Sequence, residues 1–211
     1  AYGSFGNQGI HAEHHVITKI EDNAGNVIYQ YRPKFKRVMK QETAWMMTDL
    51  LQTVVQAGTG TNAQIAGVQC AGKTGTTQDD KDAWFVGYTP YYTCAVWMGY
   101  DRKETMNKTY GGSYPARLWK AAMSAAVAGS NGSFPIPSGV EQVAICKISG
   151  KLATPACPEE DIEVKMLKAQ EKPQETCDKH ILIKICSESG KLATPGCPSP
   201  VDQGFLKDLP P

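Results

Sequence analysis

A lysine at position 73, followed by threonine and glycine, has two chemical interpretations. Residues 67–74 fit the pattern G-x4-G-K-[ST] of a phosphate-binding loop, in which amides at the start of a helix hold the phosphates of a nucleotide. That loop needs a buried strand before Gly67 and a helix beginning at Lys73. Residues 62–66 make a poor buried strand, and residues 75–80 make a poor helix start because they open with glycine and two threonines. Nucleotide binding is therefore only a remote alternative.

The cysteines near the end of the chain form a second set of candidate residues. Five of the seven cysteines lie in the last third: Cys146, Cys157, Cys177, Cys186 and Cys197. Residues 145–158 and 185–198 form an internal repeat at an offset of 40, with 11 of the 14 positions identical. Two copies are too few for a solenoid, so each copy is expected to be a small loop closed at its ends by its two cysteines.

The equal spacing within the two copies predicts two disulfides, with Cys177 left over: Cys146–Cys157 and Cys186–Cys197. Pairing of Cys177 with one of the repeat cysteines is an alternative. Zinc is another, because Cys177 and His180 form a Cys-x-x-His motif and Cys146 and Cys157 could supply two further ligands. An oxidising compartment favours disulfides, whereas a reducing compartment favours the metal.

The hydrophobic pattern around Lys73 predicts strands. Segments 15–21 and 26–31 are rich in valine, isoleucine and tyrosine and flank the turn-forming Asp22–Gly25, which predicts a β-hairpin. Short apolar segments separated by turn residues predict three further strands at residues 70–75, 83–88 and 92–100. Because no helix start follows Lys73, we expect residues 73–76 to lie at the edge of an antiparallel sheet.

Two helices are expected to cover this sheet. The first spans residues 41–57, with Gly58 at its C-terminal cap. Its apolar residues recur at helical spacing: Met47, Leu50, Leu51, Val54 and Val55. The second helix is an alanine-rich stretch over residues 116–128, and Pro115 suits its first turn.

Length and charge limit the class of protein. The 211 residues suffice for one medium domain and a small module, and breakers at residues 131–140 indicate a linker between them. The predicted organisation is a domain at residues 1–130 and a cysteine-containing tail at residues 141–211. A net charge of +1 excludes a strongly basic nucleic-acid-binding protein. No apolar run approaches the ~18 residues of a membrane span.

Lys73-Thr74-Gly75 is also the third motif of the active-site-serine penicillin-recognising enzymes, and its flanking sequence extends the match. Seven segments closely resemble the transpeptidase domain of class A penicillin-binding proteins: residues 1–9, 43–51, 54–61, 71–77, 82–90, 96–101 and 111–120. The resemblance covers about residues 1–129. It implies an α+β fold, the C-terminal part of the penicillin-binding-protein transpeptidase or serine β-lactamase-like fold, with an antiparallel sheet flanked by helices. A small, loop-rich, cysteine-rich tail would follow.

The resemblance implies a peptidoglycan D,D-transpeptidase, in which a serine attacks the bond between two terminal D-alanines of a stem peptide. Lys73 and Thr76 would be catalytic, Lys73 through its positive charge and Thr76 through a backbone N–H in the oxyanion hole. The hydroxyls of Thr74 and Thr76 would donate to the substrate carboxylate, because residues two apart in a strand share a face. Gly75 would allow close approach, and Thr77 would complete the substrate-binding segment. Trp84 is expected to pack in the core behind this strand.

The family also needs a Ser-x-x-Lys nucleophile motif and a Ser-x-Asn motif, and the sequence contains neither. Both precede the lysine motif in the family, so we expect the chain to be the C-terminal portion of a transpeptidase domain and to be inactive alone. The expected partners are stem peptides ending in D-Ala-D-Ala, β-lactam antibiotics and the upstream part of the protein, with no nucleic acid.

The resemblance places the protein on the extracytoplasmic face of the bacterial plasma membrane, attached only through an upstream anchor. That compartment favours disulfides over zinc, so no metal and no cofactor are expected. A non-catalytic module that binds the cell wall or a partner is the alternative function.

Overall fold

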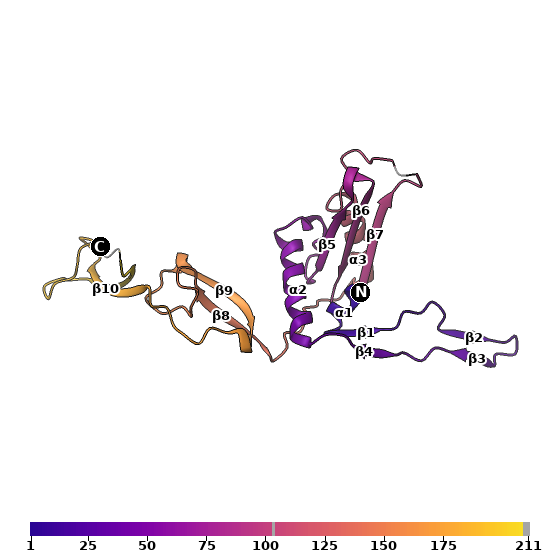
Figure 1. Cartoon of the computed structure of the whole chain (residues 1–211), viewed down its shortest axis with the longest axis horizontal. Coiled ribbons are helices and arrows are strands. Elements are labelled where there is room, and N and C mark those ends of the chain that lie inside the picture. Colours follow the sequence, from indigo (N-terminus) through magenta and orange to yellow (C-terminus); the bar gives the residue numbers. More distant parts are fainter. Residues whose placement is uncertain (103, 209–211) are drawn as a thin grey trace. The chain divides into compact units, whose positions relative to one another are not determined.

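The structure is a computed structural model and describes residues 1–102 and 104–208. The chain divides into two compact units, Ala1–Pro137 and Ser138–Pro211. The first unit mixes helices with antiparallel strands, as the predicted α+β class requires, and the second is built mainly from two hairpins (Figure 1). Within the described part of the chain, each helix is too short or too polar to cross a membrane.

The first unit contains a three-stranded antiparallel sheet in the order β5-β6-β7. Its strands are β5 (Ala71–Thr76), β6 (Asp82–Tyr88) and β7 (Thr93–Gly99), which confirms the three predicted strands. Lys73 pairs with Val86 in the middle of β5, so no helix begins there. The phosphate-loop interpretation is therefore wrong, because its lysine must lie at the start of a helix.

Two helices pack against this sheet, as predicted. Helix α2 (Gln41–Gln56) contacts β5, and α3 (Tyr114–Ala126) contacts β6 and β7. Between them lies a buried cluster around Phe85 and Trp119, whose rings meet edge to face with centroids 5.3 Å apart. The indole N–H of Trp119 reaches the carbonyls of Gly87 and Cys94, so its polar atom is satisfied inside the core.

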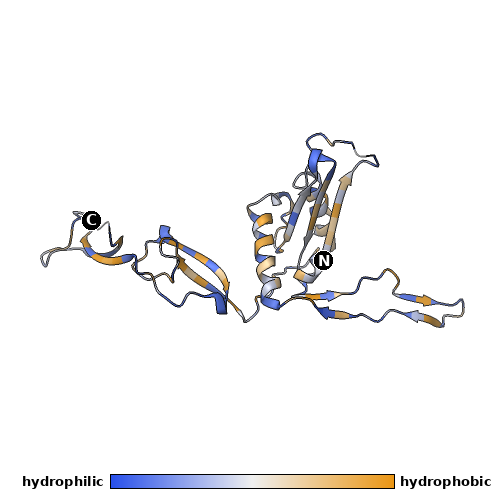
Figure 2. Ribbon diagram, viewed as in Figure 1, coloured by the Kyte–Doolittle hydropathy of each residue, from blue (hydrophilic) through white to orange (hydrophobic). Residues whose placement is uncertain are grey.

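The buried sides of these elements differ in part from the sequence expectation. On α2, Met47 and Leu50 are 38% and 61% exposed, whereas Leu51 and Val55 are buried. Figure 2 shows hydrophobic stretches at several places along α2. Trp84 is 41% exposed, so the expectation that it packs in the core is wrong. Successive side chains of a strand point to opposite faces, and Phe85 takes the inner face instead.

The predicted hairpin is present and longer than expected. Strands β2 (Lys19–Glu21) and β3 (Val27–Gln30) pair next to the turn, and β1 (Ile10–Ala12) pairs with β4 (Phe35–Arg37) farther along the same arm (Figure 1). A short helix, α1 (Tyr2–Gly6), precedes it. The Asp22 carboxylate accepts bonds from the backbone of Ala24 and Asn26, which closes the turn.

The second unit consists of two hairpins that contain the two repeats. Strands β8 (Val140–Cys146) and β9 (Ile162–Lys168) form the first, and β10 (His180–Cys186) and β11 (Pro200–Leu206) form the second. Their loops share one backbone pattern. The amide of Cys146 donates to Lys151 at 2.9 Å, and that of Cys186 donates to Lys191 at 2.8 Å. The repeat seen in the sequence is therefore a structural repeat.

The segment predicted as a linker is mostly part of the first unit. The amide of Gln69 donates to the Gly132 carbonyl at 2.9 Å, and the Gln69 side chain accepts from the Phe134 amide at 2.7 Å. Phe134 is buried and meets the ring of Tyr88 edge to face. Only a short stretch remains between Pro137, which ends the first unit, and Val140, which begins β8.

Candidate functional site

Strand β5 is an edge strand of the described sheet, because it pairs with β6 alone in the order β5-β6-β7. An edge strand offers backbone N–H and C=O groups to an added peptide strand. Residues 73–76 lie in this strand, as predicted, and are exposed or partly exposed. The strand is thus positioned to bind an extended peptide.

The hydroxyl of Thr74 lies in a network with Thr59 and Lys73. The Thr59 and Thr74 hydroxyl oxygens are 2.8 Å apart, and the Lys73 ammonium donates to the Thr74 hydroxyl at 3.2 Å. A hydroxyl oxygen has two lone pairs and one hydrogen. If Thr59 donates, both lone pairs of Thr74 are filled, and the Thr74 hydrogen is free for an anion.

The hydroxyl of Thr76 has a similar arrangement. It accepts a hydrogen bond from the Gly111 amide at 3.2 Å, which leaves its own hydrogen free. Gly111 must be glycine here, because an added Cβ would lie 2.2 Å from the Trp84 carbonyl oxygen and 2.7 Å from that of Gly75. The close approach of Gly111 thus fixes the position of the Thr76 hydroxyl.

Lys73 and Thr77 differ in how their side chains are used. The Lys73 ammonium donates to the Thr74 carbonyl at 3.0 Å and stays beside the hydroxyl network. The Thr77 hydroxyl instead accepts from the Asp82 amide at 2.8 Å and donates to its carboxylate at 3.1 Å. These bonds close the turn between β5 and β6. Substrate binding by Thr77 stays a prediction, and its hydroxyl has a structural role that the sequence analysis missed.

Two contacts to β5, from Thr59 and Gly111, and one contact beside it come from distant segments. Thr59, Asn62 and Gly111 lie outside the strand, and the Asn62 side chain donates to the Gly112 carbonyl at 2.7 Å. A sequence signal was present for Thr59 and Gly111, because Gly58–Thr61 and Gly111-Gly112 are among the segments that resemble the family. The partner of each residue is set by packing, so the sequence assigned them no role.

A cavity of about 580 Å³ lies elsewhere in the first unit, beside Val55 and Cys70. No acidic or basic side chain is among the described residues that line it. Burial raises the pKa of the Cys70 thiol, which disfavours the nucleophilic thiolate. The cavity therefore lacks the groups for acid–base or nucleophilic catalysis, and β5 remains the candidate site.

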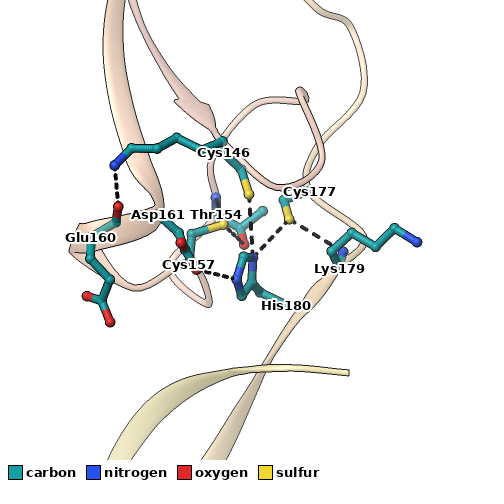
Figure 3. Close-up of polar contacts among 9 residues, drawn as sticks. Cys146, Thr154, Cys157, Glu160, Asp161, Cys177, Lys179 and His180 are labelled. Atoms are coloured by element: carbon teal, nitrogen blue, oxygen red, sulfur yellow. Dashed lines mark hydrogen bonds and ion pairs between the residues drawn. The ribbon is translucent and has the colours of Figure 1, made fainter. Parts of the chain in front are cut away.

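The second unit holds a separate cluster of four buried side chains: Cys146, Cys157, Cys177 and His180. Their three Sγ atoms and one imidazole nitrogen all lie within 4.8 Å of one another. Figure 3 shows the imidazole of His180 beside the cysteines and joined to Asp161 by a hydrogen bond. Burial raises the pKa of Cys177, but hydrogen bonds from Ser149, His180 and nearby amides outweigh it and lower that pKa to about 6.

The disulfides predicted within the repeats, Cys146–Cys157 and Cys186–Cys197, are not present in the structure, where all seven cysteines are free. In the first repeat, Cys146 and Cys157 lie in one cluster with a third thiol and an imidazole, so their two sulfurs do not form an isolated pair. In the second repeat, the Cys197 thiol lies close enough to hydrogen-bond Cys186 and lowers its pKa to about 7.

Comparison with known protein families gives two matches along the chain. Residues 1–124 match the penicillin binding protein transpeptidase domain. Residues 136–182 match the penicillin-binding protein 1A, C-terminal domain. The second match includes all four residues of the cysteine–histidine cluster and ends before the second repeat loop.

Individual relatives agree with these matches. The chain is 40% identical over 176 residues to penicillin-binding protein 1A/1B of Bacillus subtilis, which covers 75% of this chain and 19% of that protein. PonA1 of Mycobacterium tuberculosis is 30% identical, with a TM-score of 0.58 over 65% of this chain and 39% of that one. Penicillin-binding protein 1A of Haemophilus influenzae, 20% identical, has the same fold, with a TM-score of 0.69 over 83% of this chain and 32% of that one.

Proposed function

The chain belongs to the penicillin-binding protein transpeptidase family, and on that premise we propose that it forms the carboxylate-binding side of a peptidoglycan D,D-transpeptidase site. The nucleophilic serine would come from a part of the protein outside this sequence, since no Ser-x-x-Lys motif occurs in the chain. The chain spans 19% of the length of the Bacillus subtilis relative, which supports this division.

The observation that carries the proposal is the pair of hydroxyls on β5. Thr74 and Thr76 are two residues apart in an edge strand, and each hydroxyl oxygen lies within 3.2 Å of a protein donor. Each hydroxyl can therefore donate its own hydrogen to a carboxylate. Hydrogen bonds to a charged acceptor are roughly twice as strong as neutral ones, which suits the terminal carboxylate of a stem peptide.

The remaining groups of β5 fit the same role. The backbone edge can pair with an extended donor peptide ending in D-Ala-D-Ala, and the Lys73 ammonium adds positive charge beside its carboxylate. The amide of Thr76 would be one donor of the oxyanion hole. β-Lactams, which imitate the D-Ala-D-Ala terminus, would bind in the same place. The protein would act on the outer face of the plasma membrane, where peptidoglycan is cross-linked.

The hydroxyls are tested by Thr74→Val and Thr76→Val in the longer protein that contains this chain and its nucleophile. Each lost bond to a charged group costs roughly 1.5–3 kcal/mol, so acylation by a fluorescent penicillin should slow about 10- to 150-fold. Thr93→Val, at an exposed position of β7, is the matched control and should acylate at the wild-type rate. Unchanged rates in both β5 variants would show that these hydroxyls do not contact the substrate.

The position of the nucleophile is tested with the 211-residue chain by itself. Fluorescent penicillin should leave this chain unlabelled and should label the longer protein, because acylation needs a serine activated by a nearby base. A covalent adduct on the chain alone would show that the nucleophile lies within it, and our assignment of the missing motif would be wrong.

A further inference from the structure

The cysteine–histidine cluster is built by the backbone of the first repeat. Cys146 ends β8, and the loop that follows returns so that Leu152 pairs with Thr176 in a parallel bridge. The amide of Cys177 donates to the Leu152 carbonyl at 2.8 Å, which places Cys177 beside the loop. Lys151, in the loop, also forms salt bridges with Glu175 and Asp178, which flank Cys177 in sequence. The cluster is therefore held by the fold of this unit.

The distances within the cluster fit a tetrahedral metal site. Zinc ligated by thiolates and imidazole has bonds of about 2.3 Å to sulfur and about 2.0–2.1 Å to nitrogen, so ligand atoms lie roughly 3.5–3.8 Å apart. The Nδ1 atom of His180 lies 3.5 Å from Sγ of Cys146 and 3.3 Å from Sγ of Cys177. Cys157 completes a set whose members all lie within 4.8 Å of one another.

The imidazole of His180 is oriented for metal binding. Its Nε2 atom lies 3.0 Å from the Asp161 carboxylate, on the side away from the sulfurs (Figure 3). Since a carboxylate only accepts, Nε2 carries a proton, and Nδ1 can present its lone pair to a metal once its own proton has been displaced. A histidine that ligates a metal usually donates its other N–H to such a partner.

Backbone amides also point at the sulfurs. The amide of Thr154 lies 3.4 Å from Sγ of Cys157, and that of Lys179 lies 3.4 Å from Sγ of Cys177. These donors would stabilise thiolates, which are the ligand form of cysteine. From the ligand set, its distances and these supporting bonds, we propose that Cys146, Cys157, Cys177 and His180 bind one structural zinc ion.

A structural role follows from the number of ligands and from the core. Four protein ligands fill the tetrahedral shell of zinc and leave no open position for a substrate. The buried cluster of this unit consists of the three cysteines, with Ala153 and Ile162 packed against it. Small units that lack a large hydrophobic core commonly depend on a metal or on disulfides. The zinc would therefore stabilise the second unit.

Two other uses of these residues are less consistent with the geometry. Cys177, His180 and Asp161 also form a thiol–imidazole–carboxylate series, as in a cysteine hydrolase. However, Cys177 is only 9% exposed, and two further thiols share the face of the imidazole where a substrate would sit. A Cys146–Cys157 disulfide would use two of the four converging groups and leave Cys177 and His180 paired only with each other and with Asp161.

The second repeat supplies a matched control. Cys186 and Cys197 correspond to Cys146 and Cys157 at the offset of 40, and the positions equivalent to Cys177 and His180 lie outside the 211 residues of this sequence. Two cysteines alone are half of a structural site. In the 211-residue chain we therefore expect one tightly bound zinc ion, held by the first repeat.

The test measures zinc in the full chain purified without chelator. The wild type should contain about one zinc ion per chain, and Cys177→Ser and His180→Ala should lose it, while Cys186→Ser and Cys197→Ser should keep it. Asp161→Asn should still bind one equivalent but with 10- to 100-fold lower affinity, since it alters only the partner of the ligand. Because ligand variants can fail to fold, a wild-type Co²⁺ titration provides the independent measurement. It should saturate at one equivalent with the visible absorption of tetrahedral thiolate-bound cobalt.

Two results would overturn the proposal. The first is wild-type chain that contains no zinc and takes up no Co²⁺ under reducing conditions. The second is a non-reducing peptide map of the protein isolated from its native compartment in which Cys146, Cys157 or Cys177 is disulfide-bonded. Neither result depends on acylation, so the zinc site and the transpeptidase function are tested independently of each other.

Discussion

The hydroxyl of Thr59 is predicted to orient that of Thr74, because their oxygens are 2.8 Å apart. Thr59→Val in the longer protein should slow penicillin acylation by a few-fold, reflecting a neutral hydrogen bond of about 0.5–1.5 kcal/mol. The double variant with Thr74→Val should be no slower than Thr74→Val alone, since Thr59 acts only through Thr74. Acylation kinetics of the four proteins in this cycle check the prediction. Additive losses would show that Thr59 acts independently.

Tyr88 is predicted to make the first unit sensitive to alkali. Its hydroxyl lies 2.9 Å from that of Thr48, which can donate to the Ala44 carbonyl, and burial raises the pKa of Tyr88 from 10.0 to about 12. In the unfolded chain the phenol loses its proton near pH 10, whereas the folded state holds it until about pH 12. The contribution of protonated Tyr88 to the free energy of unfolding is thus fully present below pH 10 and is lost as the pH rises from 10 to 12.

The comparison with Tyr88→Phe isolates this effect. The urea midpoint of the wild type should fall relative to that of the variant as the pH rises from 9 towards 12, because phenylalanine does not titrate. Thr48 keeps its bond to the Ala44 carbonyl in the variant, so no buried donor is left unpaired. A constant difference between the two midpoints across this range would contradict the shift in the pKa of Tyr88.

At the scale of elements, the segment before α3 is predicted to set the position of β5. Gly111→Ala places a Cβ against backbone atoms of Trp84 and Gly75, at 2.2 Å and 2.7 Å from their carbonyl oxygens, so one of the two segments must move. Forcing atoms into packed space typically costs about 1–3 kcal/mol. Urea unfolding of the chain should show this loss. Gly196→Ala, which meets nothing within 4 Å, should leave the free energy of unfolding nearly unchanged.

The elements themselves could be predicted from sequence more accurately than the sides they bury. Helix α2 and strands β5, β6 and β7 appear within one or two residues of their expected bounds. The periodicity of α2 is local information, but Leu50 is 61% exposed and Leu51 is 7% exposed. Two adjacent leucines carry the same sequence signal, and only the elements packed against the helix distinguish them.

At the scale of the molecule, the two units are predicted to respond differently to metal removal. All four tryptophans lie in the first unit: Trp45, Trp84, Trp97 and Trp119. A strong chelator should lower the stability of the second unit, seen as loss of β-structure by circular dichroism at lower temperature, while the tryptophan fluorescence transition stays in place. Cys177→Ser should behave like the chelated wild type and show no further response to chelator. A chelator shift in the fluorescence transition would contradict separate stabilisation.

The sequence by itself determined the family, the strand that carries Lys73 to Thr76, and the repeat in the tail. Each depends on contiguous motifs or on local periodicity, which a short stretch of chain encodes without its neighbours. Failure of the phosphate-loop interpretation was also foreseeable, because residues after Lys73 disfavour a helix.

Only the tertiary structure decided which distant groups meet. Thr59 and Gly111 reach β5 through packing, and Cys177 with His180 reach Cys146 through the pairing of Leu152 with Thr176. Sequence spacing favoured disulfides because it shows two cysteines at a time. The fold brings three thiols and one imidazole within 4.8 Å, and the proposed zinc site depends on that convergence.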